Sequence, residues 1–208
     1  QSVGAVMTDR EGSVWAGAVS GGLHRFSRRV LQYWGADAGL APTAVTSVVE
    51  DASGALFAGT ANRGIFRFEN GRFNALTDPV PAKHSIIYCT TATSDGGIWA
   101  AGEQCLFRFQ QGQATKAYLD PPVRGEAIRA LCADGEALCL GTYASALLKC
   151  DAGGVQVVAP AGSFPGSISS LVREAADTFW VGTTAGLHRW ERGQVRTWTT
   201  RDGLPTDN

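Results

Sequence analysis

A short motif that occurs five times constrains the fold of this chain more than any other feature of its sequence. In residues 56–60 it reads LFAGT, a large side chain followed by a small residue and a glycine. The glycines of the five copies lie 42, 43, 39 and 41 residues apart: Gly17, Gly59, Gly102, Gly141 and Gly182. The large residue two or three positions earlier is Trp15, Phe57, Trp99, Cys139 or Trp180. Such regular spacing is typical of a chain built from structural repeats.

A second motif follows each copy of the first after a short loop. It consists of an aliphatic residue, a variable residue, a basic residue and usually an aromatic one, as in residues 65–68. A β-branched run such as 45–49 precedes the first motif, and the pair Asn70-Gly71 with another short run follows the second. Asn-Gly between two strand-like runs is a strong hairpin signal. Each repeat therefore predicts four short antiparallel strands.

Four antiparallel strands per repeat indicate the blade of a β-propeller, and no window of the sequence shows helical periodicity. We expect an all-β protein whose residues 1–208 form a single β-propeller domain, with five repeats of about 41 residues. The expected blades are 1–43, 44–85, 86–126, 127–167 and 168–208. Two arrangements remain open, because the five blades either close on themselves or form an arc of a larger ring.

Composition agrees with this interpretation and excludes some functions. Glycine supplies 26 of 208 residues, well above the usual share of about 7%. Because glycine destabilises the interiors of helices and strands, we expect the excess at turns and strand exits. The net charge of −1 argues against a general nucleic-acid binder, which would carry a basic excess. No apolar run approaches the length of about 18 residues that a membrane helix needs.

The repeat resembles that of a known family. The pattern D-x-x-G-x-L-F-x-G-T at 51–60, followed by GIFRF at 64–68, is similar to the two-component regulator propeller repeat. The sequence DGLP at 202–205 resembles the link between blades in that family. Repeats three and four depart from the pattern, because Cys105 and Ala146 stand where a glycine is expected.

The resemblance implies a function as well as a fold. It implies a sensor or ligand-recognition domain of a two-component-type signalling protein, in the periplasm or outside a bacterial cell. The propellers of this family are often seven-bladed and often sense saccharides or other small molecules. Their kinase or cyclase output machinery is not present in this sequence, so we expect no catalysis by this segment. An open arc would associate through its exposed sheet faces, so a second copy of the chain, in a homodimer, is one expected partner.

Two other function classes compete with the sensor. One is a scaffold that binds other proteins, and the other is an enzyme, a lyase or hydrolase, whose site is built from distant loops. The sequence contains no G-x-S-x-G, H-E-x-x-H, Walker or dinucleotide-binding motif,. We therefore expect no catalytic residues, no cofactor and no metal.

Several repeated residues are expected to have structural roles. The large residue of the first motif would fill the space between neighbouring sheets, and its glycine would allow close backbone approach. The basic series should lie with its stems packed and its charges paired: Arg25, Arg67, Arg108, Lys149 and Arg189. His24 and His188 stand where other repeats have phenylalanine, which favours packing over catalysis.

The cysteines form no metal or redox motif by spacing. There are five of them: Cys89, Cys105, Cys132, Cys139 and Cys150. Cys132 and Cys139 flank the short turn 134–136, so they are expected opposite one another on a hairpin. A cross-strand disulfide and buried free thiols both remain open for this pair.

A ligand is expected at the loops, where the repeats stop resembling each other. In a propeller, the loops from strand two to three and from strand four to the next blade gather on one face. The ligand-binding candidates there are Arg63, Glu103, Gln104, Tyr143, His84 and Arg124. The alternative is that these are ordinary solvated loop residues.

Overall fold

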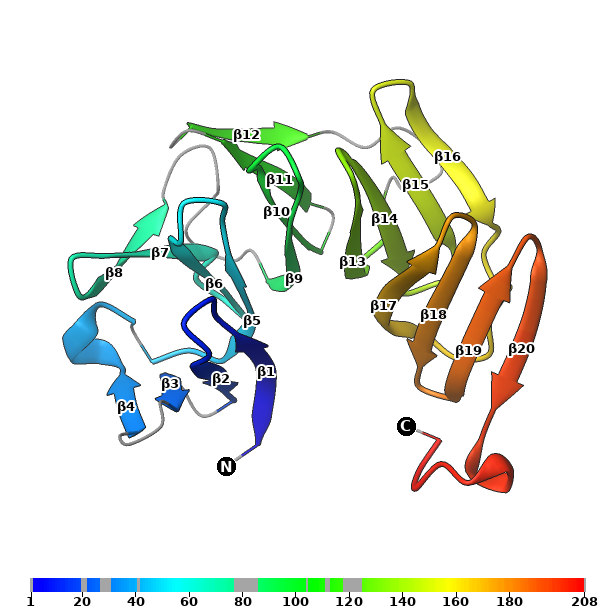
Figure 1. The fold of residues 1–208 in the computed structure, drawn as a ribbon, viewed down its shortest axis with the longest axis horizontal. Coiled ribbons are helices and arrows are strands. Elements are labelled where there is room, and N and C mark those ends of the chain that lie inside the picture. Colours follow the sequence, from blue (N-terminus) through cyan, green and yellow to red (C-terminus); the bar gives the residue numbers. More distant parts are fainter. Residues whose placement is uncertain are drawn as a thin grey trace. The chain divides into compact units, whose positions relative to one another are not determined.

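Five four-stranded antiparallel sheets make up the structure, a computed structural model. It describes residues 2–19, 22–26, 31–40, 42–76, 86–103, 105–110, 113–117 and 125–207. Within each sheet the strands follow one another in chain order (Figure 1). The expected all-β architecture of four-stranded antiparallel units is thus confirmed. In the described ranges, helical structure is confined to the 3-10 turns η1 (Ala36–Ala38) and η2 (Thr200–Asp202).

The chain forms two compact units, Gln1–Ala117 and Tyr118–Asn208. The first holds sheets 1 to 3. Sheet 1 comprises β1 (Val3–Thr8), β2 (Val14–Ala18), β3 (Leu23–Phe26) and β4 (Leu31–Trp34). Sheet 2 comprises β5 (Val45–Glu50), β6 (Leu56–Thr60), β7 (Ile65–Glu69) and β8 (Arg72–Leu76). Sheet 3 comprises β9 (Ile87–Ala92), β10 (Ile98–Gly102), β11 (Cys105–Gln110) and β12 (Gln113–Ala117).

The second unit holds sheets 4 and 5. Sheet 4 comprises β13 (Ile128–Asp134), β14 (Ala137–Thr142), β15 (Leu147–Asp151) and β16 (Gly154–Ala159). Sheet 5 comprises β17 (Ile168–Ala175), β18 (Thr178–Thr183), β19 (Gly186–Glu191) and β20 (Gln194–Trp198). Among the described parts of the chain, no helix has the length and apolar character to cross a membrane.

The hydrophobic core lies between neighbouring sheets of the same unit. One cluster joins sheets 1 and 2, a second joins sheets 2 and 3, and a third joins sheets 4 and 5. Burial is complete along β6, a middle strand, whereas the last strand, β20, is almost wholly exposed. The hydrophobic effect therefore holds each sheet mainly through its inner strands.

Local turn chemistry sets the strand boundaries. At the β7–β8 turn, Asn70 and Gly71 have φ values of 53° and 77°, the two positive angles that a type I′ hairpin turn requires. In the β14–β15 loop, Ala146 replaces a glycine, and the positive φ moves to Ser145 at 63°. The loop still closes, because the Thr142 N–H donates to the Ala146 carbonyl at 3.0 Å.

Three of the repeated glycines of the first motif lie where the next sheet comes close: Gly17, Gly59 and Gly141. A Cβ on Gly17 would lie 2.7 Å from Val45, and one on Gly59 would lie 2.7 Å from Ile87. Opposite Gly59, strand β5 carries a bulge between Val45 and Ser47. The bulge and the missing side chain together allow the first strand of one sheet to pack against the second strand of the previous one.

In sheets 1 to 3 the basic residue of the second motif lies over the aromatic residue of the first. The guanidinium carbon of Arg25 is 5.4 Å from the Trp15 ring centre, and that of Arg67 is 5.8 Å from Phe57. Each also pairs with a carboxylate, Arg25 with Glu11 at 2.6 Å and Arg67 with Glu69 at 2.7 Å. This packed and paired arrangement matches the structural role expected for the series.

His188 is fully buried and hydrogen-bonded on both ring nitrogens. Its Nε2 lies 2.9 Å from Thr183 Oγ1, and its Nδ1 lies 2.9 Å from Thr197 Oγ1. Burial lowers the pKa of His188, because the charged imidazolium would lose its hydration. The histidine therefore packs as a neutral polar residue at a position that is phenylalanine in sheets 2 and 3.

Cys132 and Cys139 are register partners across β13 and β14, as expected from the turn between them. Both are free thiols, as are the other three cysteines. Burial, with a smaller contribution from Cys132, raises the pKa of Cys139 to about 12. Such a thiol is a poor nucleophile, because the thiolate is the reactive form.

Candidate functional site

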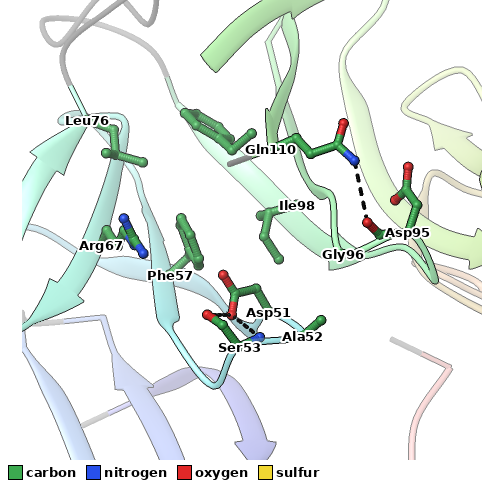
Figure 2. Close-up of a pocket in the computed structure, with 11 residues that line it drawn as sticks. Asp51, Ala52, Ser53, Phe57, Arg67, Leu76, Asp95, Gly96, Ile98 and Gln110 are labelled. Atoms are coloured by element: carbon green, nitrogen blue, oxygen red, sulfur yellow. Dashed lines mark hydrogen bonds between the residues drawn. The ribbon is translucent and has the colours of Figure 1, made fainter. Parts of the chain in front are cut away.

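A cleft of about 480 Å³ opens between sheets 2 and 3, and we call it the sheet 2/3 cleft (Figure 2). It lies where the β5–β6 and β9–β10 turns meet the middle strands of the two sheets. Its volume falls in the range typical of small-molecule sites, about 300–1,000 Å³. The cleft is lined by Asp51, Ala52, Ser53, Phe57, Arg67, Leu76, Asp95, Gly96, Ile98, Phe109 and Gln110.

Asp51 is held in place by the β5–β6 turn. Its Oδ1 accepts hydrogen bonds from the Ser53 N–H at 2.8 Å, the Ser53 hydroxyl at 2.6 Å and the Ala55 N–H at 2.9 Å. Partial burial raises the pKa of Asp51, but these hydrogen bonds and the charge of Arg67 outweigh it and keep the pKa below its usual value. Asp51 is therefore an anion at neutral pH.

The second oxygen of Asp51 differs from its counterpart in sheet 1. Asp9 occupies the same turn position, and its Oδ2 accepts a 2.7 Å hydrogen bond from the Trp15 indole. In sheet 2 the residue at the Trp15 position is Phe57, which has no N–H to donate. Among the described residues, Asp51 Oδ2 has no hydrogen-bond or ion-pair partner. Figure 2 shows this oxygen turned away from Ser53, toward Phe57 and Ile98.

The other charged groups around the cleft are already paired. Arg67 bonds Glu69 at 2.7 Å, and Arg108 pairs with Asp95. Asp95 Oδ1 also accepts from Thr93 Oγ1 at 2.7 Å. Hydrogen bonds from Thr93 and Gly97 are the main causes that lower the pKa of Asp95, with Arg108 adding to them. These contacts fix the polar rim, and among its described atoms Arg67 Nε and Arg108 Nε are buried without a hydrogen-bond partner.

The apolar wall comes from both sheets. Phe57 and Phe109 lie with ring centres 6.4 Å apart and are 5% and 4% exposed. Leu76 and Ile98 complete the wall. The cleft thus has an apolar wall beside its polar rim, which suits the apolar part of a small ligand.

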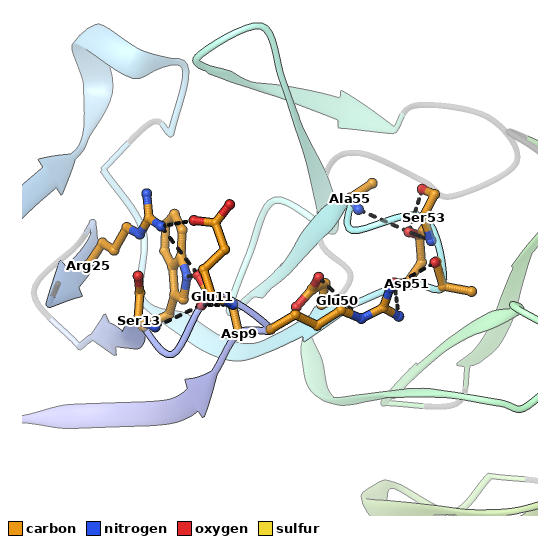
Figure 3. Close-up of polar contacts among 11 residues, drawn as sticks. Asp9, Glu11, Ser13, Arg25, Glu50, Asp51, Ser53 and Ala55 are labelled. Atoms are coloured by element: carbon orange, nitrogen blue, oxygen red, sulfur yellow. Dashed lines mark hydrogen bonds and ion pairs between the residues drawn. The ribbon is translucent and has the colours of Figure 1, made fainter.

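A second cleft, of about 430 Å³, lies between sheets 1 and 2, and we call it the sheet 1/2 cleft. It has the same place in the repeat, but its polar groups bind each other (Figure 3). Asp9 bonds Trp15, Arg25 bonds Glu11 at 2.6 Å, and Arg10 reaches across to the carbonyls of Asp51 and Ala52. The two clefts can therefore be compared position by position.

The sequence-predicted ligand residues lie elsewhere. Arg63 and Glu103 are exposed and follow the carboxyl ends of β6 and β10, the opposite ends of these strands from the turns that form the cleft. Tyr143 is 61% exposed in the β14–β15 loop of the second unit. Gln104, His84 and Arg124 lie outside the described residues. None of the three described candidates lines the sheet 2/3 cleft, and their binding role stays a prediction.

The sequence also held a signal for the cleft that its motifs alone did not reveal. From the sequence, Phe57 and Arg67 are expected to pack, and Asp51 only begins the D-x-x-G pattern. Asp51 precedes Phe57 by the same six positions that separate Asp9 from Trp15. A comparison of these two positions across the repeats shows that sheet 2 has the carboxylate but lacks the indole donor.

Comparison with known proteins supports the fold. No family model and no curated protein sequence matches this chain. The extracellular domain of a protein described as a hybrid two-component system from B. thetaiotaomicron is similar, with TM-score 0.80 and 18% identity over 99% of this chain and 29% of that chain. Virginiamycin B lyase from Staphylococcus aureus has TM-score 0.77 and 15% identity over 94% of this chain and 69% of that chain. At these identities the likeness concerns the fold alone.

Proposed function

We propose that this chain is an extracytoplasmic ligand-recognition segment of a two-component-type signalling protein, and that it is not itself catalytic. The observation that carries the proposal is the similarity of 99% of the chain to an extracellular domain of a protein described as a hybrid two-component system. The D-x-x-G-x-L-F-x-G-T repeat supports it independently. The chain spans 29% of that relative's chain, so the output function belongs to the proposal for the whole protein.

The recognised molecule would be small, and two places are open to it. One is the loops that follow the second strands, with Arg63 and Glu103 in the first unit or Tyr143 in the second. The other is the sheet 2/3 cleft, whose volume and mixed polar and apolar lining suit a small ligand,.

A thermal-shift screen over glycans, amines and other metabolites tests the proposal. A ligand at 100 times its Kd stabilises the folded state by about 2.7 kcal/mol, so a true ligand raises Tm in a concentration-dependent way. Repeating each positive result with Arg63→Ala, Tyr143→Ala and Asp51→Asn locates the site. A complete lack of stabilising molecules would count against ligand recognition.

A lyase is the second candidate, because virginiamycin B lyase shares the fold over 69% of its own chain. Any molecule that stabilises the protein should be incubated with it and analysed by mass spectrometry. Unchanged ligand supports the recognition proposal, whereas a new product at catalytic turnover would favour the enzyme.

We further propose that the five sheets are consecutive blades of a β-propeller, either closed or part of a larger ring. Small-angle scattering combined with light scattering separates a closed disc, an open arc and a homodimer. A globular monomer profile would favour closure, and a concentration-dependent doubling of mass would favour association through open sheet faces.

A further inference from the structure

We infer that the sheet 2/3 cleft binds a primary amine, whose ammonium group donates to Asp51 Oδ2 while its apolar part packs against Phe57 and Phe109. The inference rests on the proposed ligand-recognition function, because it names the chemistry of the molecule that the cleft would recognise. Three features of the cleft support it.

The first feature is an acceptor without a donor. In sheet 1 the turn carboxylate of Asp9 receives the Trp15 indole N–H at 2.7 Å. In sheet 5, Glu174 holds the same offset from Trp180, and hydrogen bonds from Arg189 and Trp180 lower its pKa. Sheet 2 keeps the carboxylate, Asp51, but Phe57 supplies no donor. A ligand N–H in the cleft would take the place of the missing indole N–H.

The second feature is the charge balance. Each guanidinium near the cleft has a carboxylate within ion-pair distance: Arg10 with Glu50, Arg67 with Glu69, and Arg108 with Asp95. Asp51 is the additional carboxylate, and its lowered pKa keeps it ionised at neutral pH. The cleft therefore carries one negative charge in excess, which favours a cation over an anion or a neutral molecule, since hydrogen bonds between charged partners are stronger.

The third feature is the wall beside that charge. The rings of Phe57 and Phe109 lie 6.4 Å apart, at an interplanar angle of 40°. Aromatic faces attract cations and bury apolar groups. An ammonium group on a flat or aliphatic body satisfies both the carboxylate and the rings, within a volume of about 480 Å³.

The sheet 1/2 cleft gives the contrasting case. It has a similar volume, about 430 Å³, and the same repeat position. Its turn carboxylate is already occupied by Trp15, and Arg25 lies 3.6 Å from the same Asp9 oxygen. The turn carboxylate there has no oxygen left without a partner, so we expect the amine to bind more tightly at sheet 2/3 than at sheet 1/2.

Phenethylamine and phenethyl alcohol are suitable probes, because they have the same shape and differ in charge. Binding to the full chain is measured by calorimetry at neutral pH, with amide chemical shifts to locate the site. We expect the amine to bind about tenfold or more tightly than the alcohol, as expected for a bond to a charged group. Equal affinities, or no binding of the amine, would overturn the inference.

Two variants and one control separate the site from general effects. Asp51→Asn keeps the Oδ1 acceptor that holds the turn and replaces Oδ2 by an amide donor. Phe57→Trp supplies the indole N–H that sheets 1 and 5 use and fills part of the cleft. Both are expected to weaken amine binding about tenfold or more. Glu11→Gln removes the same charge from the sheet 1/2 cleft and should leave binding unchanged.

The outcomes distinguish this inference from the proposed function. If amine affinity is the same in the wild type, Asp51→Asn and Phe57→Trp, the amine site is refuted. If in addition a different molecule from the metabolite screen binds and loses affinity in Arg63→Ala, ligand recognition stands without the amine site. Thermal unfolding of each variant confirms that loss of binding occurs in a folded protein.

Discussion

The Trp15 indole donates a 2.7 Å hydrogen bond to Asp9 Oδ2, and so ties the β1–β2 turn to the middle of sheet 1. The bond joins two residues whose spacing recurs in sheet 2 as Asp51 and Phe57, where the donor is missing. In sheet 3 the situation is reversed. Trp99 has the indole, but its Nε1 is buried without a hydrogen-bond partner among the described residues. The repeats thus share positions but not hydrogen bonds.

Trp15→Phe should destabilise the protein by about 1–3 kcal/mol, because it leaves the Asp9 oxygen without its donor. Phe57→Trp should have the opposite sign, with a gain of about 1 kcal/mol from the restored bond. Urea denaturation at neutral pH measures both. If Trp15→Phe leaves the unfolding midpoint unchanged, the indole bond contributes nothing to stability.

Gly59→Ala should destabilise by about 1–3 kcal/mol, the usual cost of overpacking. The new Cβ would lie 2.7 Å from Ile87 and closer still to the Ser47 hydroxyl, so the first strand of sheet 3 would have to move away. Gly153→Ala is the milder control, because at this exposed turn position the new Cβ would lie 3.1 Å from the Asp151 side chain and meet no neighbouring sheet within 4 Å. Equal stability of the two variants, measured by chemical denaturation, would contradict the close-approach role.

Stability should fall as the pH drops below about 6.5, the ordinary pKa of histidine. Burial lowers the pKa of His188 in the folded state, so the unfolded chain binds the proton first and the free energy of unfolding decreases. The slope is at most about 1.4 kcal/mol per pH unit. Denaturation between about pH 7 and pH 5 measures it.

His188→Phe is the control for this pH effect, since phenylalanine occupies the same repeat position at Phe66 and Phe107. The variant should lose most of the slope over this range. It should also be less stable at pH 7 than the wild type, because the Thr183 and Thr197 hydroxyls lose their partner,. A slope that persists in the variant would assign the effect to another group.

The stability of the protein at alkaline pH should depend on Cys139. Its pKa is raised from 9.0 to about 12 in the folded protein, so above pH 9 the unfolded chain releases a proton that the folded chain retains. The free energy of unfolding should then decrease with rising pH by up to about 1.4 kcal/mol per unit. Cys139→Ala should be less stable at neutral pH but flatter above pH 9. An identical alkaline slope in the two proteins would contradict this prediction.

Alkylation under denaturing conditions without reductant should label all five cysteines, which are free thiols in the structure. Intact-mass spectrometry counts the added groups directly. A loss of two labels that reduction restores would instead show a disulfide, and the register partners Cys132 and Cys139 would be the first pair to map.

The strands were predictable because their signal is repeated. The runs at 56–60 and 65–68 became β6 and most of β7, and the Asn70-Gly71 turn adopted the expected hairpin angles. Five copies of a motif average out the ambiguity that a single short apolar run carries. The opposition of Cys132 and Cys139 followed from turn length alone, because two-residue turns fix strand register.

The cleft was not predictable from motifs in the same way. It depends on the distance between Phe57 and Phe109, which belong to different sheets, and on a donor that one repeat lacks. Periodicity assigns residues to strands and faces, but it does not show which polar atoms remain unbonded after the sheets pack. Loop variability predicts ligand contacts at Arg63 and Tyr143, whereas the side chains that line the cleft belong mainly to turns and strands.

In each sheet, one backbone hydrogen bond closes the start of the loop between the second and third strands. The residue after the second strand donates to the residue before the first, as in Ala61 to Ala44, and the same bond joins these pairs: Val19–Ser2, Glu103–Ile86, Tyr143–Ala127 and Thr184–Ser167. The loops themselves differ in length and sequence, from residues 61–64 in sheet 2 to 184–185 in sheet 5. We therefore expect that a loop of different length or chemistry, inserted between this bond and the third strand, leaves the sheet intact and changes only what the loop can bind.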